Sequence, residues 1–195
     1  MARRIARRAG EFYDHLARGV EAAAARYGGE EFALAFGGNE MAGYHTGPGT
    51  YLTYLMGARH SHLDSAGYAL DQADLREGKE RSPEELARAL FAEEARRQIL
   101  SSLVVCFFAR GLYDLGTISR CLAVLGEDWD EGVLRSLGEG ILRRKYAFKL
   151  REGFDPGKLR IPARIAETPA PSGTIDPGYL RAAIASLGKL LAPSE

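Results

Sequence analysis

Two histidines and two aspartates stand close together in residues 57–71, GARHSHLDSAGYALD. His60, His62 and Asp64 are each separated by one residue, so in an extended segment their side chains would point to the same side. Imidazole and carboxylate groups are ligands that zinc and iron accept. The spacing therefore allows half of a metal site. The same histidines could instead be packed and hydrogen-bonded in a turn between helices, which is the commoner use of such a string.

This string is similar to the metal-binding string of the metallo-β-lactamase fold. In that fold another histidine directly follows the aspartate and others come later, whereas here position 65 is serine and no histidine follows His62. The β-rich context of that fold is also missing. A small metal-binding protein that uses His60, His62 and Asp64 therefore stays an alternative interpretation.

The segments that must position these side chains are predicted to be helices. Apolar residues recur every three to four positions through most of the chain, which is the periodicity of a helix with one buried face. Ser82 and Pro83 are typical of a helix start, and Asp130 is expected to cap another helix. The predicted helices cover residues 2–27, 50–61, 82 to about 115, 117–126, 131–151 and 176–195.

The predicted fold class is all-α, with one helical domain over residues 1–195. A minor short strand is expected around Phe32, Leu34 and Phe36, where large apolar residues alternate with smaller ones. Residues 154–177 are rich in proline and lack a clear period, which predicts an ordered coil that wraps over the surface. Residues 65–80 carry no pattern that assigns them.

Composition and charge narrow the function classes. Lys+Arg and Asp+Glu both total 26, and this neutral balance argues against a nucleic-acid-binding protein. No apolar run is long enough to cross a bilayer, and the longest, residues 99–108, is predicted to be a buried helix. The two cysteines, Cys106 and Cys121, form no disulfide framework and favour a reducing cytoplasm.

Five short elements follow one another through the C-terminal half. They are Trp129-Asp130, Gly138-Glu139, Arg151-Glu152-Gly153-Phe154, Ile161-Pro162-Ala163-Arg164 and Glu167-Thr168-Pro169-Ala170-Pro171-Ser172-Gly173. In this order and spacing they resemble the C-terminal region of the aldehyde ferredoxin oxidoreductase family. The upstream stretches LARGVEAAAARYG and FGGNEMAGY also resemble that family. The resemblance covers residues 16 to about 175 and is weakest over 65–98.

Enzymes of that family oxidise aldehydes to acids at a tungsten or molybdenum centre held by two pterins, and a neighbouring 4Fe-4S cluster passes the electrons to ferredoxin. In such enzymes the protein positions and tunes a cofactor that does the redox chemistry. The resemblance implies that residues 1–64 correspond to the end of the family's second domain with its active-site turn. It implies that residues 82–175 correspond to the third domain, followed by a terminal helix over 176–195.

The resemblance also assigns candidate site residues. His62 becomes the proton-handling residue beside the substrate, with His60 second, because a neutral imidazole can accept a proton as an aldehyde or its hydrate is oxidised. Arg59 and Asp64 are expected to contact the cofactor in the same turn. Cys106 matches the family cysteine that supplies a thiolate to the cluster, in a motif that also binds one pterin.

The motif around Cys106 departs from the family's pattern. The family has aspartate-x-x-glycine-leucine-cysteine, whereas this chain has Ser101 at the aspartate position and Val104 at the glycine position. Serine keeps a hydrogen-bonding hydroxyl but loses the charge, and valine adds branched bulk where the backbone can need to approach a ligand. Cys106 could instead be a small buried apolar residue, as most free cysteines are, and Cys121 is expected in the core.

No cysteine precedes position 106, and one thiolate cannot hold a four-iron cluster alone. We therefore expect the pterin and cluster cofactors only when a partner completes the site, and neither cofactor nor activity in the isolated chain. The expected partner is the N-terminal portion of a split oxidoreductase or a second copy of the chain. The basic stripe of residues 143–151 could meet ferredoxin or be a solvated helix face. A non-catalytic helical interaction protein that lost the cofactor is the main alternative.

Overall fold

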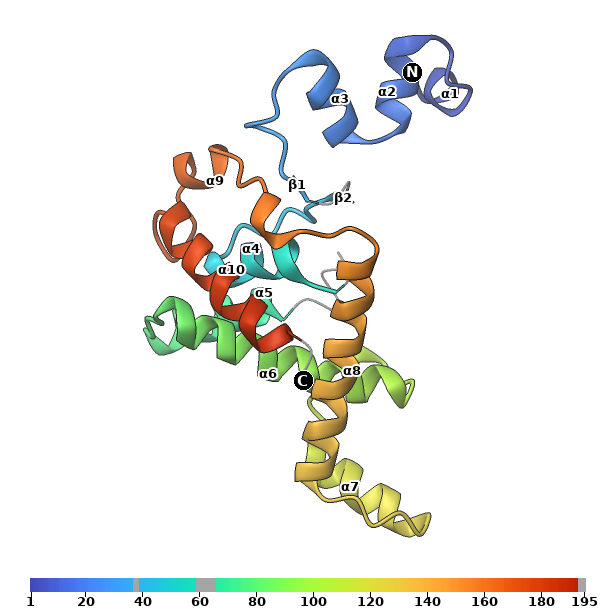
Figure 1. Cartoon of the computed structure of the whole chain (residues 1–195), viewed down its shortest axis with the longest axis vertical. Coiled ribbons are helices and arrows are strands. Elements are labelled where there is room, and N and C mark those ends of the chain that lie inside the picture. The colour runs from blue at the N-terminus through green and yellow to red at the C-terminus, as the bar shows by residue number, and fades with distance from the viewer. Residues whose placement is uncertain (37–38, 59–65, 193–195) are drawn as a thin grey trace.

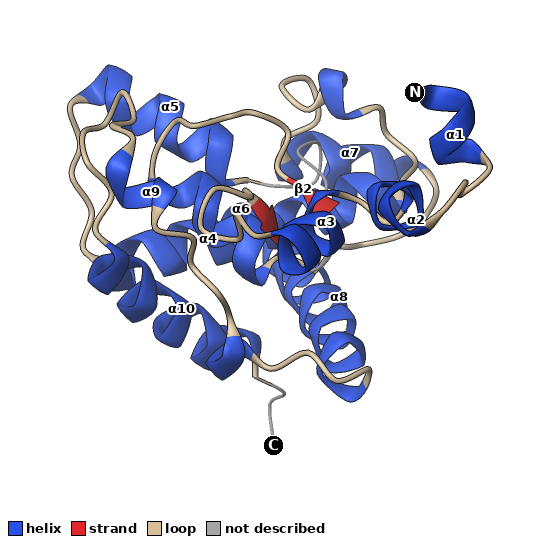
Figure 2. Cartoon of the chain, turned by 90° about the horizontal axis from the view of Figure 1, so that it is seen from above, coloured by secondary structure: helices blue, strands red, loops and turns tan. Residues whose placement is uncertain are grey.

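A computed structural model describes residues 1–36, 39–58 and 66–192, and these are mostly helical (Figures 1 and 2). The helices are α1 Ala2–Ala6, α2 Glu11–Ala17, α3 Val20–Tyr27, α4 Pro48–Met56, α5 Gly67–Glu77, α6 Pro83–Ser102, α7 Leu115–Val124, α8 Glu131–Arg151, α9 Arg164–Glu167 and α10 Pro177–Leu191, with 3₁₀ turns at Phe107–Ala109 and Pro156–Lys158. Strands β1 Ala35–Phe36 and β2 Asn39–Glu40 form an antiparallel pair beside α3 (Figure 2). The all-α prediction with a minor strand is confirmed.

The core is built around α6, which packs against both α8 and α10 (Figure 1). Helix α4 contacts α5 and α10 on the other side of this layer. Leu52, Leu90 and Leu180, from α4, α6 and α10, are fully buried in the main apolar cluster. A smaller cluster that includes Ile99 and Ile118 joins α6 and α7 to the start of α8. Helix α7 is therefore attached to α6 and α8 through a few apolar contacts.

The N-terminal segment differs from its prediction. A single helix was expected over residues 2–27, but the chain forms α1, α2 and α3 in succession. Gly10 and Gly19 precede α2 and α3 with φ angles of 97° and 103°. These angles lie in the region that glycine reaches without steric cost and that interrupts a helix. Because the apolar period continues across both glycines, periodicity alone could not show the breaks.

The start of α6 is as predicted. Ser82 Oγ accepts a hydrogen bond from the Glu85 N–H at 3.2 Å, and the Glu85 carboxylate accepts one from the Ser82 N–H at 2.8 Å. This reciprocal pair is a capping box. Helices α7 and α8 also begin at capping aspartates, and Asp130 Oδ1 accepts from the Val133 N–H at 2.8 Å as expected.

The end of α6 is not as predicted. The helix stops at Ser102, well before the expected limit near residue 115. Val104 takes a φ of 58°, which turns the chain out of the helix. The predicted buried helix over residues 99–108 is therefore wrong in its second half, and an irregular stretch with one 3₁₀ turn follows.

The proline-rich segment is ordered, as predicted. Ile165 in the short helix α9 is fully buried, and Ala170 and Gly173 form an isolated bridge. The Arg160 guanidinium donates to the carbonyl oxygens of Glu30 and Ala33. The segment thereby connects the region around α3 to the main body.

Candidate cofactor site

The histidine segment, which we define as residues 59–65, follows a helix with no solvent-facing side. His60, His62, Arg59 and Asp64 all belong to this segment and lie outside the described residues. Helix α4, which precedes it, is buried at every residue from 49 to 56. The prediction of a short helix here is confirmed, although α4 ends at Met56 and keeps no exposed face. The described residues around the segment belong to α4, α5 and α8.

The N-terminal end of α4 is held by Asp71, which projects from α5. Its carboxylate accepts hydrogen bonds from the N–H groups of Gly49 and Thr50, both at 2.8 Å, and from the hydroxyls of Thr50 and Thr46 at 2.8 and 3.1 Å. A carboxylate at a helix N-terminus satisfies free donors and opposes the positive end of the helix dipole. Asp71 therefore caps α4 from a distant helix.

Burial sets the ionisation of Asp71. Desolvation raises the pKa of this carboxyl above its ordinary value of 3.8, and the hydrogen bonds from Thr50, Gly49 and Thr46 only partly oppose it. Burial raises the pKa of the Tyr51 hydroxyl to about 12, with a smaller lowering effect from the Arg164 guanidinium and a smaller raising effect from the Asp71 carboxylate. The helix start is thus a dry, strongly hydrogen-bonded junction.

The C-terminal end of α4 is held from α8. Lys149 Nζ donates to the carbonyl oxygen of Gly57 at 2.7 Å, and the Tyr146 hydroxyl lies 3.8 Å from the Met56 sulfur. A cation near the last carbonyls of a helix opposes the negative end of its dipole. At each end of α4, a charged side chain from another helix therefore opposes the helix dipole. Asp71 does so at the N-terminal end and Lys149 at the C-terminal end.

The far side of the histidine segment is held just as closely. Ala66 is fully buried, and the Gly67 N–H donates to Thr53 Oγ1 at 3.0 Å. A Cβ atom at Gly67 would stand 1.9 Å from the Gly49 carbonyl oxygen, so α4 and α5 approach as only glycine permits. The histidine segment therefore connects α4 to α5, two helices that are in close backbone contact.

A third histidine, His45, was not singled out from the sequence. Its Nε2 lies 2.7 Å from the Thr168 carbonyl oxygen and its Nδ1 lies 2.5 Å from the Tyr51 hydroxyl. A carbonyl can only accept, so we assign the proton of the neutral ring to Nε2 and let Tyr51 donate to Nδ1. His45 thereby ties the proline-rich segment to α4, and its isolated place in the sequence gave no signal of this.

The second group of predicted site residues consists of Ser101 and Cys106. Ser101 lies near the end of α6, and Cys106 lies in the loop that follows, residues 103–112, which we call the cysteine loop. Cys106 is exposed, which excludes the interpretation of a small buried apolar residue. Ser101 is also exposed, near the end of α6. Cys121 is exposed on α7, so its predicted place in the core is wrong. The predicted helix ran on beyond Ser102 and so included Cys106, whereas the expectation for Cys121 rested on the general burial of free cysteines.

Phe107 anchors the cysteine loop next to the thiol. The guanidinium carbons of Arg97 and Arg110 lie 4.4 and 4.5 Å from the centre of its ring. Arg97 is buried, and Glu93 accepts from its Nε at 2.9 Å. Stacked guanidinium groups of this kind are attracted to the ring face. The loop is thus fixed from α6, although the thiol itself faces solvent.

Val104, which replaces the family glycine, has a backbone conformation that favours glycine. Its φ of 58° is the left-handed conformation that glycine adopts freely and that costs a branched residue about 1–2 kcal/mol. We predict that Val104→Gly raises the free energy of unfolding by about 1 kcal/mol, because the lost strain exceeds the added chain entropy. Chemical denaturation measures this change.

The control for that variant is Val133→Gly, an exposed valine with ordinary helical φ in α8. It should lower the free energy of unfolding by roughly 0.5–1 kcal/mol. Equal losses of stability at both positions would show that Val104 is not strained.

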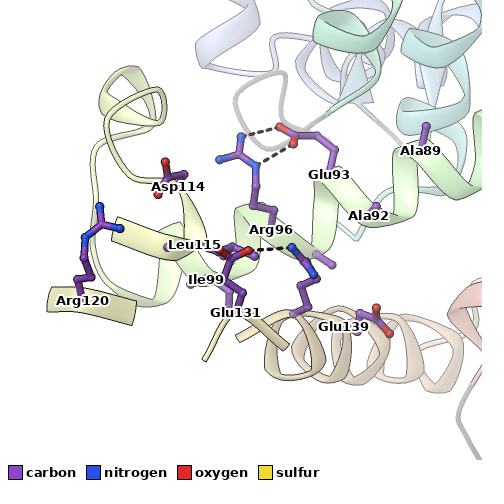
Figure 3. Close-up of a pocket in the computed structure, with 13 residues that line it drawn as sticks. Ala89, Ala92, Glu93, Arg96, Ile99, Asp114, Leu115, Arg120, Glu131 and Glu139 are labelled. Carbon is purple, nitrogen blue, oxygen red and sulfur yellow. Dashed lines mark hydrogen bonds and ion pairs between the residues drawn. The ribbon is translucent and has the colours of Figure 1, made fainter. Parts of the chain in front are cut away.

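A cavity of about 700 Å³ lies between α6, α7 and the start of α8 (Figure 3). Its charged side chains form ion pairs within single helices, with Arg96 bonded to Glu93 on α6 at 2.9 Å and Arg135 bonded to Glu131 on α8 at 2.9 Å. The remaining charged groups of the wall, Asp114, Arg120 and Glu139, are hydrogen-bonded as well. Of the predicted site residues that the structure describes, neither Ser101 nor Cys106 lines this cavity.

The residues that the structure describes do not by themselves fit an iron–sulfur cluster. Within the described parts of the chain, no group of three or more His, Cys, Asp and Glu side chains could hold a metal ion. Cys106 offers one thiol, and a four-iron cluster takes four thiolates. Any cluster bound at Cys106 would need ligands that the described residues do not supply.

The basic stripe of α8 is less solvated than expected. Arg143 donates to the Leu190 carbonyl oxygen at 3.1 Å, and Lys145 donates to Gln98 Oε1 at 2.5 Å. Together with Lys149 these side chains connect α8 to α10, α6 and α4. Arg144 and Arg151 remain on the exposed side. The solvated-face interpretation therefore holds for only part of the stripe.

The fold and these sites define an all-α chain in which a buried helix leads into the histidine segment and a separate loop exposes a cysteine. Comparison with protein families finds a match to aldehyde ferredoxin oxidoreductase, domains 2 & 3, over residues 1–189. The chain belongs to the aldehyde ferredoxin oxidoreductase family. The resemblance recognised from the sequence is confirmed.

No curated protein and no solved structure matches the chain significantly. Within the described residues, none of the helices combines the length and the apolar character needed to span a membrane.

Proposed function

We infer that this chain is a subunit or domain of a tungsten- or molybdenum-pterin aldehyde oxidoreductase-like enzyme and completes the cofactor site together with an N-terminal part of that enzyme. The observation that carries this proposal is the family match over residues 1–189. In this proposal His62 takes the proton released as the aldehyde hydrate is oxidised, with His60 beside it. Arg59, Asp64 and Ser101 contact a pterin.

The surface around Cys106 supports the proposal that a second polypeptide binds there. Val104, Phe108 and Leu112 are 90%, 82% and 74% exposed. Large apolar side chains gathered in one loop are typical of protein–protein contact. The proposed occupant is the N-terminal portion of a split oxidoreductase, which would bring the missing thiolates next to Cys106. Ferredoxin is the proposed electron acceptor.

The test is co-expression of this chain with a polypeptide that carries the family's N-terminal domain. We expect the pair to co-purify with tungsten or molybdenum and with iron, and to reduce a viologen dye when an aldehyde is added. The isolated chain should do neither. Cys106→Ser should lose iron but keep the pair together, whereas Cys121→Ser, the matched control on the other exposed thiol, should keep both.

Two outcomes would contradict the proposal. Zinc or iron bound stoichiometrically to the isolated chain would favour the small metal-binding protein that uses His60, His62 and Asp64. A stable pair without tungsten, molybdenum or iron would favour the non-catalytic interaction protein. The strained Val104 at a family glycine position is the observation that supports this last alternative.

A further inference from the structure

We propose that copies of this chain associate head to tail, with the N-terminal end of one copy bound to the turn between α7 and α8 of the next. The two surfaces are residues 1–8, which we call the basic end, and residues 124–131, which we call the acidic turn. They lie at opposite ends of the longest axis of the molecule (Figure 1). This association needs no cofactor and goes beyond the proposed function.

The basic end carries positive charge only. Its charged side chains are all arginines, and all of them are exposed: Arg3, Arg4, Arg7 and Arg8. Arg4 and Arg8 interact with side chains of α2. Among the residues that the structure describes, Arg3 and Arg7 have no side-chain partner. Two guanidinium groups, which match carboxylates in geometry and charge, are therefore available to a partner.

The helices at this end gain little packing from their own chain. Helices α1 and α2 have five and seven residues, and neither contains a buried residue. Helices this short are marginal in water unless they pack against another surface. Met1 and Phe12 are 82% and 46% exposed beside the arginines. The basic end is therefore an uncovered surface that a bound partner would stabilise.

The acidic turn carries the opposite charge. Its charged side chains are all carboxylates, and all of them are exposed: Glu127, Asp128, Asp130 and Glu131. The last two make hydrogen bonds within the first turns of α8. Glu127 and Asp128 have no side-chain partner in the part of the chain that the structure describes. Two carboxylates are thus available to match the two guanidinium groups.

The acidic turn has a defined backbone and exposes apolar side chains next to these carboxylates. The Glu127 N–H donates to the Leu122 carbonyl oxygen at 3.1 Å, and Gly126 has a φ of 86°. A left-handed glycine with such a bond is a common end of a helix. Val124 and Leu125, just before it, are 86% and 77% exposed. The turn therefore offers apolar contact as well as charge.

Charge complementarity favours a second copy of this chain as the occupant. The free guanidinium groups at one end match the free carboxylates at the other, and both ends expose apolar side chains. The formal net charge of the chain is zero, so two copies do not repel each other overall. Because the two surfaces differ, each copy can bind one neighbour at each end, and such contacts produce rings or open chains.

Sedimentation of the isolated chain tests the association. At low ionic strength and rising protein concentration, the weight-average mass should reach at least about twice the 21.3 kDa of one chain. At about 1 M salt, where the Debye length is about 3 Å, the mass should fall toward 21.3 kDa. The double variants Arg3→Glu/Arg7→Glu and Glu127→Arg/Asp128→Arg should each stay monomeric at low salt.

Two comparisons separate the proposed contact from a general effect of charge. An equimolar mixture of the two double variants contains one intact copy of each surface, so it should recover association as pairs. The matched control is Arg88→Glu/Arg144→Glu, which makes the same substitutions at exposed positions of α6 and α8 outside both surfaces. This control should associate like the wild type. Circular dichroism checks that every variant keeps its helices.

Three results would overturn the inference. The first is a mass of 21.3 kDa at every concentration at low salt. The second is association that both double variants retain, because the contact would then lie elsewhere. The third is a chain that is monomeric alone and whose Arg3→Glu/Arg7→Glu variant no longer co-purifies with the family's N-terminal domain. That domain, and not a second copy, would then occupy the basic end.

Discussion

Asp71→Ala is expected to lower the free energy of unfolding by about 3 kcal/mol, because it leaves several donors without a partner. The carboxylate accepts from two backbone N–H groups and two hydroxyls at the start of α4. The N–H groups of Gly49 and Thr50 are buried, so water cannot easily replace the lost acceptor. Each unsatisfied buried donor costs about 1–3 kcal/mol. Urea denaturation followed by circular dichroism measures the change.

The matched control is Asp130→Ala, which removes an exposed helix cap with one local hydrogen bond. That change should cost about 1 kcal/mol. Similar losses for the two variants would mean that the long-range cap of α4 adds nothing beyond an ordinary local cap.

The cost of Asp71→Ala should also depend on pH. Because burial raises the pKa of Asp71 above 3.8, the folded chain binds this proton more tightly than the unfolded chain. The contribution of Asp71 to stability is therefore largest below its ordinary pKa and falls as the pH rises through the folded pKa. The difference between wild type and variant should be larger near about pH 4 than near about pH 7.

The sequence elements that identified the family have structural roles in the fold. Asp130 caps α8, and Gly153 follows that helix with a φ of 95°. Phe154 covers Lys149, and Thr168 accepts the hydrogen bond from His45. Caps and turns demand particular residue types at fixed spacings, so they leave a strong trace in a sequence. The fold class could be predicted from them for that reason.

The contacts that hold α4 were harder to predict from the sequence. Asp71 and Lys149 act on α4 from distant helices, and no local pattern shows which long-range partner a charged residue will meet. The end of α6 was missed because apolar residues continue past Ser102 while Val104 leaves the helix. Cys106 was consequently weighed as a buried residue, although the loop exposes it.

Gly138→Ala tests the central helix crossing and is expected to destabilise the chain by about 3 kcal/mol. Gly138 belongs to the Gly138-Glu139 element of the family resemblance and is buried where α8 crosses α6. A Cβ atom there would stand 2.4 Å from the Ala95 carbonyl oxygen and 3.2 Å from Ile99 Cγ1. The first of these is a backbone atom of α6, so the two helices would have to move apart.

Gly140→Ala is the control on the same helix. A Cβ atom at Gly140 meets nothing closer than Arg144 Nη2 at 3.7 Å. Replacing an uncrowded helical glycine with alanine stabilises a helix by up to about 1 kcal/mol. The two variants make the same chemical change one half-turn apart, so thermal or urea unfolding should shift in opposite directions. A gain in stability from Gly138→Ala would show that α6 and α8 do not cross as closely as described, and the attachment of Lys149 and its helix to the core would then need to be reconsidered.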